Sequence, residues 1–142
     1  MDPADVAVER SPALSRVDVC TIGGVGFGGE GLSIIAGPCM AESLDLCLHV
    51  ARTVKDICGE LGIGYVFKAS FDKANRSSVS SYRGPGLETG LEWLAEVGQT
   101  VGVPVLTDIH EPGQATLVAQ AVDCLQIPAF LARQTDLLVT AG

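Results

Sequence analysis

The sequence predicts an α/β fold, in which four strand–helix units form about half of a (β/α)8 barrel behind an N-terminal β-hairpin. Short apolar, β-rich runs alternate with segments whose apolar residues recur at helical spacing. That alternation is typical of a parallel sheet covered by helices, and it fits an open doubly wound sheet as well as a barrel. A complete barrel usually needs roughly 250 residues, whereas this chain has 142. We therefore expect a truncated barrel in one domain, residues 17–142, after a flexible leader, residues 1–16.

The first part of the chain predicts the hairpin and the first strand–helix unit. Residues 17–37 contain two β-like runs around a glycine-rich turn and lead into a strand at about Leu32–Ala36. The stretch GPCMAES then turns the chain. Ser43 is suited to cap the start of a helix over Leu44–Leu61, and Gly62 is suited to end it.

Three more strand–helix units follow in the same order. The expected strands are GYVFKAS, VPVLTD and the start of VDCLQIPAF, and a polar loop over Phe71–Gly86 follows the first of these. The expected helices lie in LETGLEWLAEVGQTVG, in the segment after IHEP, where Pro112 suits a first helical turn, and in RQTDLLVTAG.

The composition limits the class of protein. The chain has a formal net charge of −8 and is 47% hydrophobic and 18% charged, which suits a soluble globular fold. The negative balance argues against nucleic acid or an anionic membrane as partner, and no apolar run is long enough to span a bilayer. The five cysteines include no CxxC pair, so we expect a reducing cytoplasm rather than a disulfide framework or a self-contained zinc site.

Positive charge gathers in one segment, against the trend of the chain. Residues 68–83 contain only one acid but four of the nine lysines and arginines, namely Lys68, Lys73, Arg76 and Arg83. The segment begins at the carboxyl end of a strand, where α/β proteins bind ligands. A solvated loop that pairs with surface acids explains the composition equally well. However, a lysine that closes a buried strand is costly unless an anion meets it, so we predict a phosphate or carboxylate site.

Polar side chains follow the other strand ends as well. Asp108 and His110 come after VPVLT, Gln126 comes after VDCL, and Cys39 follows the first strand. In a barrel these ends converge on one mouth. Taken alone, His110 is better explained as a loop or capping histidine, Cys39 as a structural thiol, and Asp108 equally well as a helix-start carboxylate. Their shared position makes Asp108 and His110 candidate catalytic groups and Cys39 a candidate thiolate metal ligand.

Four segments carry a resemblance to a known family: IAGPCMAES, YVFKASFDKANRSSVSSYRGPGLETGL, PVLTDIHEPGQA and VDCLQIPAFLARQTDLL. They closely resemble the 3-deoxy-D-manno-octulosonate 8-phosphate (KDO8P) synthase family, from about residue 32 to the end. DAHP synthase and sialic acid synthase share the general scheme but not these strings. The resemblance implies a homotetrameric (β/α)8 barrel. It also implies condensation of phosphoenolpyruvate with D-arabinose 5-phosphate and water, which gives KDO8P and phosphate for lipopolysaccharide synthesis.

The resemblance also implies roles for individual residues. Lys68 and Lys73 would hold phosphoenolpyruvate and the reacting centre, and Asp108 and His110 would sit beside the aldehyde and the attacking water. The other implied substrate contacts are Asn75, Arg76 and Ser77 at the arabinose phosphate, Gln126, Ala129 and Phe130 in the phosphoenolpyruvate pocket, and Arg133 at a neighbouring subunit's sugar phosphate.

A cysteine at the position of Cys39 resembles the metal-dependent branch of that family, with iron, zinc or manganese as possible ions. The remaining metal ligands, a histidine and two carboxylates, would come from a later half-barrel that this chain lacks. We therefore expect an inactive fragment of a longer protein. Two other functions stay open: a sister synthase with a different sugar aldehyde, and a non-catalytic half-barrel that binds phosphorylated ligands.

Overall fold

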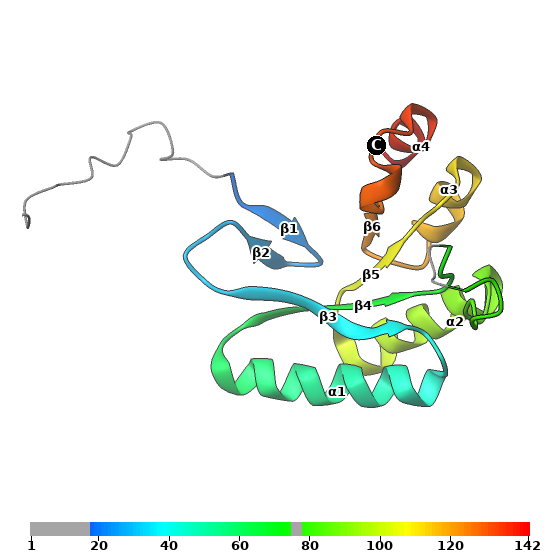
Figure 1. Cartoon of the computed structure of the whole chain (residues 1–142). Coiled ribbons are helices and arrows are strands. Elements are labelled where there is room, and N and C mark those ends of the chain that lie inside the picture. Colours follow the sequence, from blue (N-terminus) through cyan, green and yellow to red (C-terminus); the bar gives the residue numbers. More distant parts are fainter. Residues whose placement is uncertain (1–17, 75–77) are drawn as a thin grey trace, which may run out of the picture.

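The computed structural model describes residues 18–74 and 78–142. The expected leader, residues 1–16, and the candidate ligands Asn75, Arg76 and Ser77 lie outside the described residues. The described chain opens with an antiparallel hairpin, β1 (Cys20–Ile22) and β2 (Val25–Phe27), as predicted. Figure 1 shows this hairpin beside a sheet whose strands alternate with helices.

The four predicted strand–helix units are present. They are β3 (Ser33–Met40) with α1 (Leu44–Leu61), β4 (Gly64–Ser70) with α2 (Leu87–Val97), β5 (Val105–Asp108) with α3 (Ala115–Val118), and β6 (Cys124–Gln126) with α4 (Thr135–Ala141). A π-helical turn, Gly98–Gly102, extends α2, and 3-10 turns at Pro112–Gln114 and Ala129–Leu131 precede α3 and α4. All four strands are parallel, in the order β3-β4-β5-β6. This confirms the α/β class; in the described part of the chain the sheet is open rather than closed into a barrel.

Helix α1 begins and ends where its capping residues predict. The Ser43 hydroxyl accepts a hydrogen bond from the Leu46 amide at 3.2 Å, which satisfies one of the free amides of the first turn. At the other end Gly62 has φ +67°, the left-handed conformation that glycine adopts without steric penalty. The helix packs on β3 and β4, beneath which it runs in Figure 1.

Strand β3 is longer than expected. We predicted that it ends near Ala36 and that GPCM turns the chain, but the strand continues to Met40 through a bulge. Ala36 pairs with Phe67 and Cys39 pairs with Ala69, so β3 has one residue more than β4 between these two pairs. The glycine inside the bulge, Gly37, allows the two backbones to approach closely, and Cys39 takes the left-handed φ of +68°.

The two faces of β4 are as different as strand alternation predicts. Tyr65, Phe67 and Ala69 are buried in the core between the sheet and the helices. The alternate residues, from Val66 onward, point to the opposite face, where the sequence places Lys68. The hairpin lies at the amino ends of the strands and does not cover their carboxyl ends, where the candidate site lies.

No helix among residues 18–74 and 78–142 combines the length and apolar character needed to cross a membrane.

Candidate anion site at the strand ends

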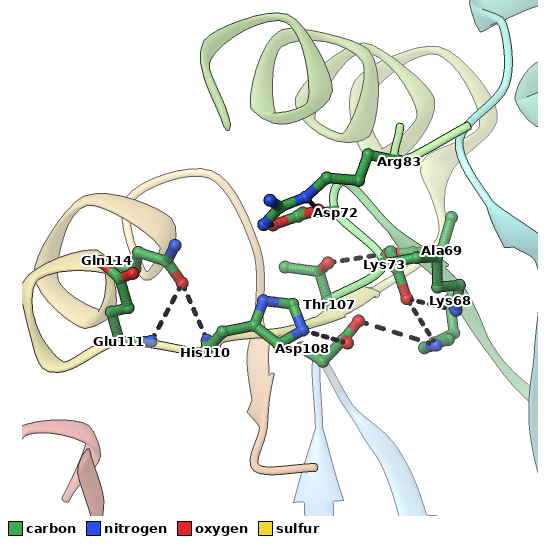
Figure 2. A network of polar contacts seen from close by, with 11 residues as sticks. Lys68, Ala69, Asp72, Lys73, Arg83, Thr107, Asp108, His110, Glu111 and Gln114 are labelled. Atoms are coloured by element: carbon green, nitrogen blue, oxygen red, sulfur yellow. Dashed lines mark hydrogen bonds and ion pairs between the residues drawn. The ribbon is translucent and has the colours of Figure 1, made fainter. Parts of the chain in front are cut away.

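Two neighbouring strands bring the polar groups of the site together at their carboxyl ends. β4 ends with Lys68 and Ser70, and β5 ends with Asp108. The Thr107 hydroxyl, which is fully buried, donates a hydrogen bond of 2.7 Å to the Ala69 carbonyl and fastens the two strand ends to each other. The site is therefore built on the sheet itself (Figure 2).

Ser70 is the point on which both lysines converge. Its hydroxyl oxygen accepts a hydrogen bond from Lys68 Nζ at 3.1 Å and another from Lys73 Nζ at 2.9 Å. Ser70 itself is fully buried. A neutral oxygen thus holds two ammonium groups together, and the repulsion between them favours a bound anion.

Asp108 and His110 form a buried pair beside these lysines. His110 Nε2 lies 3.1 Å from Asp108 Oδ2, and Lys68 Nζ lies 3.7 Å from Asp108 Oδ1. Burial alone would raise the pKa of Asp108, but the hydrogen bond with His110, the Ser70 hydroxyl and the charge of Lys68 together lower the pKa well below its usual range. Asp108 is therefore a carboxylate at neutral pH. Among the described residues, Asp108 Oδ1 and His110 Nδ1 are buried without a hydrogen-bond partner.

The backbone of His110 is capped while its side chain joins the site. Gln114 Oε1 accepts from the amides of His110 at 2.8 Å and Glu111 at 3.3 Å, at the start of the 3-10 turn. The His110 ring also packs edge to face on Phe71, with ring centroids 6.1 Å apart. The backbone of His110 is thus that of a capped loop residue, whereas its ring belongs to the site.

Arg83 pairs with a carboxylate of the loop, although the basic segment in which it lies predicts a role in the anion site. Its Nε and Nη2 each donate to the Asp72 carboxylate at 2.7 Å, which uses the guanidinium fork in a bidentate ion pair. The hydrogen bond to Asp72 raises the pKa of Arg83. The alternative of a basic residue that pairs with a loop acid therefore holds for Arg83, whereas Lys68 and Lys73 point to the site.

A cavity of about 490 Å³ opens over this cluster. Among the described residues, its walls come from the loop after β4, from the end of β5 and the residues just after it, and from the turn after β6; they are Asp72, Lys73, Ala74, Asp108, His110, Pro128, Phe130 and Leu131. The volume suits a ligand of the size of a small phosphorylated metabolite. Four predicted site residues line it, namely Lys73, Asp108, His110 and Phe130.

The other predicted ligands with described positions lie outside the walls of this cavity. Gln126 accepts the Ile109 amide with its backbone carbonyl at 3.0 Å, and its side chain is exposed. Ala129 and Arg133 are exposed on the following turns. Their roles toward a substrate stay predictions.

Cys39 is exposed at the end of β3. Within residues 18–74 and 78–142 no three histidine, cysteine, aspartate or glutamate side chains gather as a metal site requires. The described residues therefore do not by themselves hold a divalent ion, and Cys39 alone is not a metal site.

Two residues of the site escaped the sequence reasoning. Ser70 was identifiable, because it lies two residues after Lys68 on the same face of a strand. Gln114 stands three residues after Glu111, and this spacing is that of a capping box, which the side chains complete.

Comparisons with known proteins identify the family to which the chain belongs. Residues 16–142 match the DAHP synthetase I family. The chain is 54% identical over 130 residues to 2-dehydro-3-deoxyphosphooctonate aldolase of Fusobacterium nucleatum. This alignment covers 91% of this chain and 47% of that protein. It is 58% identical over 114 residues to the protein of that name from a Cyanothece species; this alignment covers 80% of this chain and 42% of the relative. It is 57% identical over 131 residues to the protein of that name from Nitrobacter hamburgensis, and this alignment covers 92% of this chain and 46% of the relative. The chain spans less than half the length of these relatives, and it belongs to the DAHP synthetase I family.

Proposed function

We propose that the complete protein carrying this chain condenses phosphoenolpyruvate with D-arabinose 5-phosphate and water to KDO8P and inorganic phosphate. The names of the similar curated proteins support this activity. The structural observation that carries it is the convergence of Lys68 and Lys73 on the buried Ser70, next to the Asp108–His110 pair. Both substrates are anions, and one of them carries a carboxylate as well as a phosphate.

The lysines bind and orient phosphoenolpyruvate. Two ammonium groups held at one hydroxyl form a compact cationic surface, which suits a carboxylate or a phosphate. Fixing both reactants in near-attack geometry lowers the entropic part of the barrier. Asn75, Arg76 and Ser77 hold the sugar phosphate in this proposal, and Gln126, Ala129, Phe130 and Arg133 complete the substrate contacts.

The reaction forms one carbon–carbon bond and one carbon–oxygen bond, the latter to the oxygen of water, and it breaks the carbon–oxygen bond to phosphate. C3 of phosphoenolpyruvate attacks the aldehyde carbon, and the aldehyde oxygen takes up a proton. The oxygen of water adds at C2, where positive charge develops, and the bond from C2 to the bridging phosphate oxygen breaks to release phosphate. In this scheme the carboxylate of Asp108 stabilises that positive charge, and its lowered pKa keeps it ionised.

His110 accepts a proton from the attacking water in this scheme. Its Nε2 faces Asp108, and when Nε2 carries the hydrogen its Nδ1 presents a lone pair. Asp108 then fixes this tautomer and stabilises the imidazolium that forms.

The finer assignments belong to the same proposal. Cys39 contributes a thiolate to a divalent ion, with its other ligands supplied from outside this chain, and no step of the reaction is assigned to that ion. The complete protein works as a cytoplasmic homotetramer.

The test compares variants of the complete protein in an assay of phosphate release. Lys68→Ala should lower kcat/KM by about 100-fold or more, because it removes a cation that acts on the reacting anion. Arg52→Ala, an exposed cation on α1, is the matched control and should leave turnover unchanged. Near-normal turnover by Lys68→Ala removes Lys68 from the mechanism. Turnover with erythrose 4-phosphate alone assigns the protein instead to the sister DAHP reaction.

A further inference from the structure

Two cysteines lie on either side of the contact between the hairpin and the sheet. Cys20 begins β1 and is exposed, and Cys124 begins β6 and is half-buried. Both are free thiols, although they lie far apart in the sequence. Neither belongs to the anion site at the other end of the strands, so a role for this pair is independent of the proposed function.

The turn of the hairpin lies against the amino ends of β5 and β6. A Cβ added to Gly23 would lie 2.5 Å from Cγ of Pro104 and 3.6 Å from Oδ1 of Asp123. Asp123 is itself fixed, because its Oδ2 accepts from the Val105 amide at 2.8 Å and its own amide donates to the Val105 carbonyl at 2.9 Å. The next residue is Cys124, so the start of β6 is held where the hairpin meets the sheet.

The thiol of Cys124 belongs to the face of the sheet on which the hairpin lies. In the parallel register Cys124 pairs with Leu106, and Leu106 pairs with Lys68, so these three residues share one face. The next residue of β6, Leu125, packs instead on the core between the sheet and the helices. Figure 1 shows β1 and β2 on the side of the sheet away from α1, which is the side of the Cys124 thiol.

The electrostatics of Cys124 agree with this placement. Burial raises the pKa of the Cys124 thiol, and the charges of Cys20 and Asp123 raise the same pKa further. Exposed charges more than about 10 Å apart are largely screened by salt, so the two sulfur atoms lie nearer to each other than that. Because Cys20 is the more exposed of the two thiols, a reagent from solution reaches it first.

We propose that Cys20 and Cys124 form a reversible dithiol site, which a disulfide oxidant such as glutathione disulfide closes into a bond between the hairpin and β6. The Cys20 thiolate attacks one sulfur of the oxidant, which forms a mixed disulfide and releases one glutathione thiol. The Cys124 thiolate then attacks the Cys20 sulfur and releases the second glutathione thiol. The two protein thiols lose two protons and two electrons, and the oxidant is reduced to two thiols. A transient bond of this kind suits a reducing compartment, where cysteine pairs act as redox sensors.

The bond should also stabilise the fold. It joins the hairpin to a strand far along the chain, and a cross-link that closes a loop of roughly 100 residues removes much of the entropy of the unfolded state. Oxidation should therefore raise the melting temperature by about 10 °C.

The experiment treats the complete protein carrying this chain with glutathione disulfide at pH 8 and maps its cysteines by mass spectrometry without reduction. The wild type should yield the linked peptides of Cys20 and Cys124. Cys39, which is exposed like Cys20 but lies at the carboxyl end of β3, is the internal control and should stop at the mixed disulfide with glutathione. In Cys124→Ser, Cys20 should stop at that mixed disulfide as well. Cys20→Ser should abolish the rise in melting temperature.

Two results overturn the proposal. If Cys20 of the wild type accumulates as the mixed disulfide to the same extent as Cys39, with no linked peptide, then Cys124 is not its partner. If the linked peptides form only in urea, or only between two copies of the protein on a non-reducing gel, then the folded hairpin does not bring the two sulfur atoms together.

Discussion

Replacing Gly37 by alanine tests how the fold positions Lys68. An ideal Cβ at residue 37 would lie 1.9 Å from the Lys68 carbonyl oxygen and 2.8 Å from its carbonyl carbon. Real Cβ contacts do not fall below 3.0 Å, so β3 and β4 must part here by at least the difference between 3.0 and 1.9 Å. The obstacle is backbone, which has no rotamer into which it can withdraw.

The cost follows from the spacing of the sheet. Neighbouring strands lie about 4.8 Å apart, so a parting of this size breaks the ladder hydrogen bonds around Lys68. Overpacking costs about 1–3 kcal/mol, and each lost hydrogen bond adds about 1 kcal/mol. We expect the free energy of unfolding to fall by about 3 kcal/mol and the melting temperature to fall by about 10 °C.

The assay is thermal unfolding of the chain followed by circular dichroism. Gly59→Ala is the matched control, because Gly59 lies inside α1 with no atom near its missing Cβ. Alanine there should raise the free energy of unfolding by about 0.5–1 kcal/mol. The two glycine substitutions should thus shift the melting temperature in opposite directions. A melting temperature for Gly37→Ala within about 2 °C of wild type refutes the close approach of β3 to Lys68.

Three further predictions concern the core and the site. Thr107→Val should lower the free energy of unfolding, measured in urea, by about 1–3 kcal/mol, because it removes the hydroxyl that donates to the buried Ala69 carbonyl. The control Thr116→Val, on the exposed side of α3, should change the free energy of unfolding little. Equal effects of the two substitutions would contradict the hydrogen bond from Thr107 to Ala69. Because the pKa of Asp108 is lowered in the folded state, its contribution to stability is complete above its unfolded pKa and is lost as the pH falls toward the folded value. The acid side of the profile of melting temperature against pH should therefore flatten in Asp108→Asn, and an unchanged profile would refute this. Burial raises the pKa of the Cys47 thiol to about 11, so iodoacetamide at pH 8 should label the exposed Cys39 and spare Cys47. Peptide mass spectrometry measures the labelling of each cysteine, and equal labelling of the two would contradict this prediction.

The features that the sequence predicts well depend on local rules. Ser43 and Gly62 define α1 because capping and the left-handed turn act within a few residues. The facing of Lys68 follows from strand alternation alone, once Phe67 is recognised as a core residue. In these cases the free energy that decides the structure is contained in the segment being read.

The features that the sequence does not predict depend on contacts between segments. The continuation of β3 to Met40 requires Gly37 to meet the Lys68 backbone, which lies about thirty residues later. The pairing of Arg83 with Asp72 likewise depends on how the loop after β4 folds back, and the count of basic residues gave Arg83 the same weight as Lys68. A charge count over a window reports composition, whereas a site depends on which charges are already neutralised.

The charged side chains described at the strand ends are paired, and this pairing bears on the proposed anion site. Both carboxylates that line the cavity among the described residues have a cation beside them, Asp108 with Lys68 and Asp72 with Arg83. The carboxylates orient the basic groups without repelling a ligand strongly, because at a few ångströms each is largely cancelled by its partner. Among the described residues, Lys73 is the cation that lines the cavity itself. The affinity of the proposed site for anions should therefore depend more on which of these pairs are intact than on how many basic residues the segment contains.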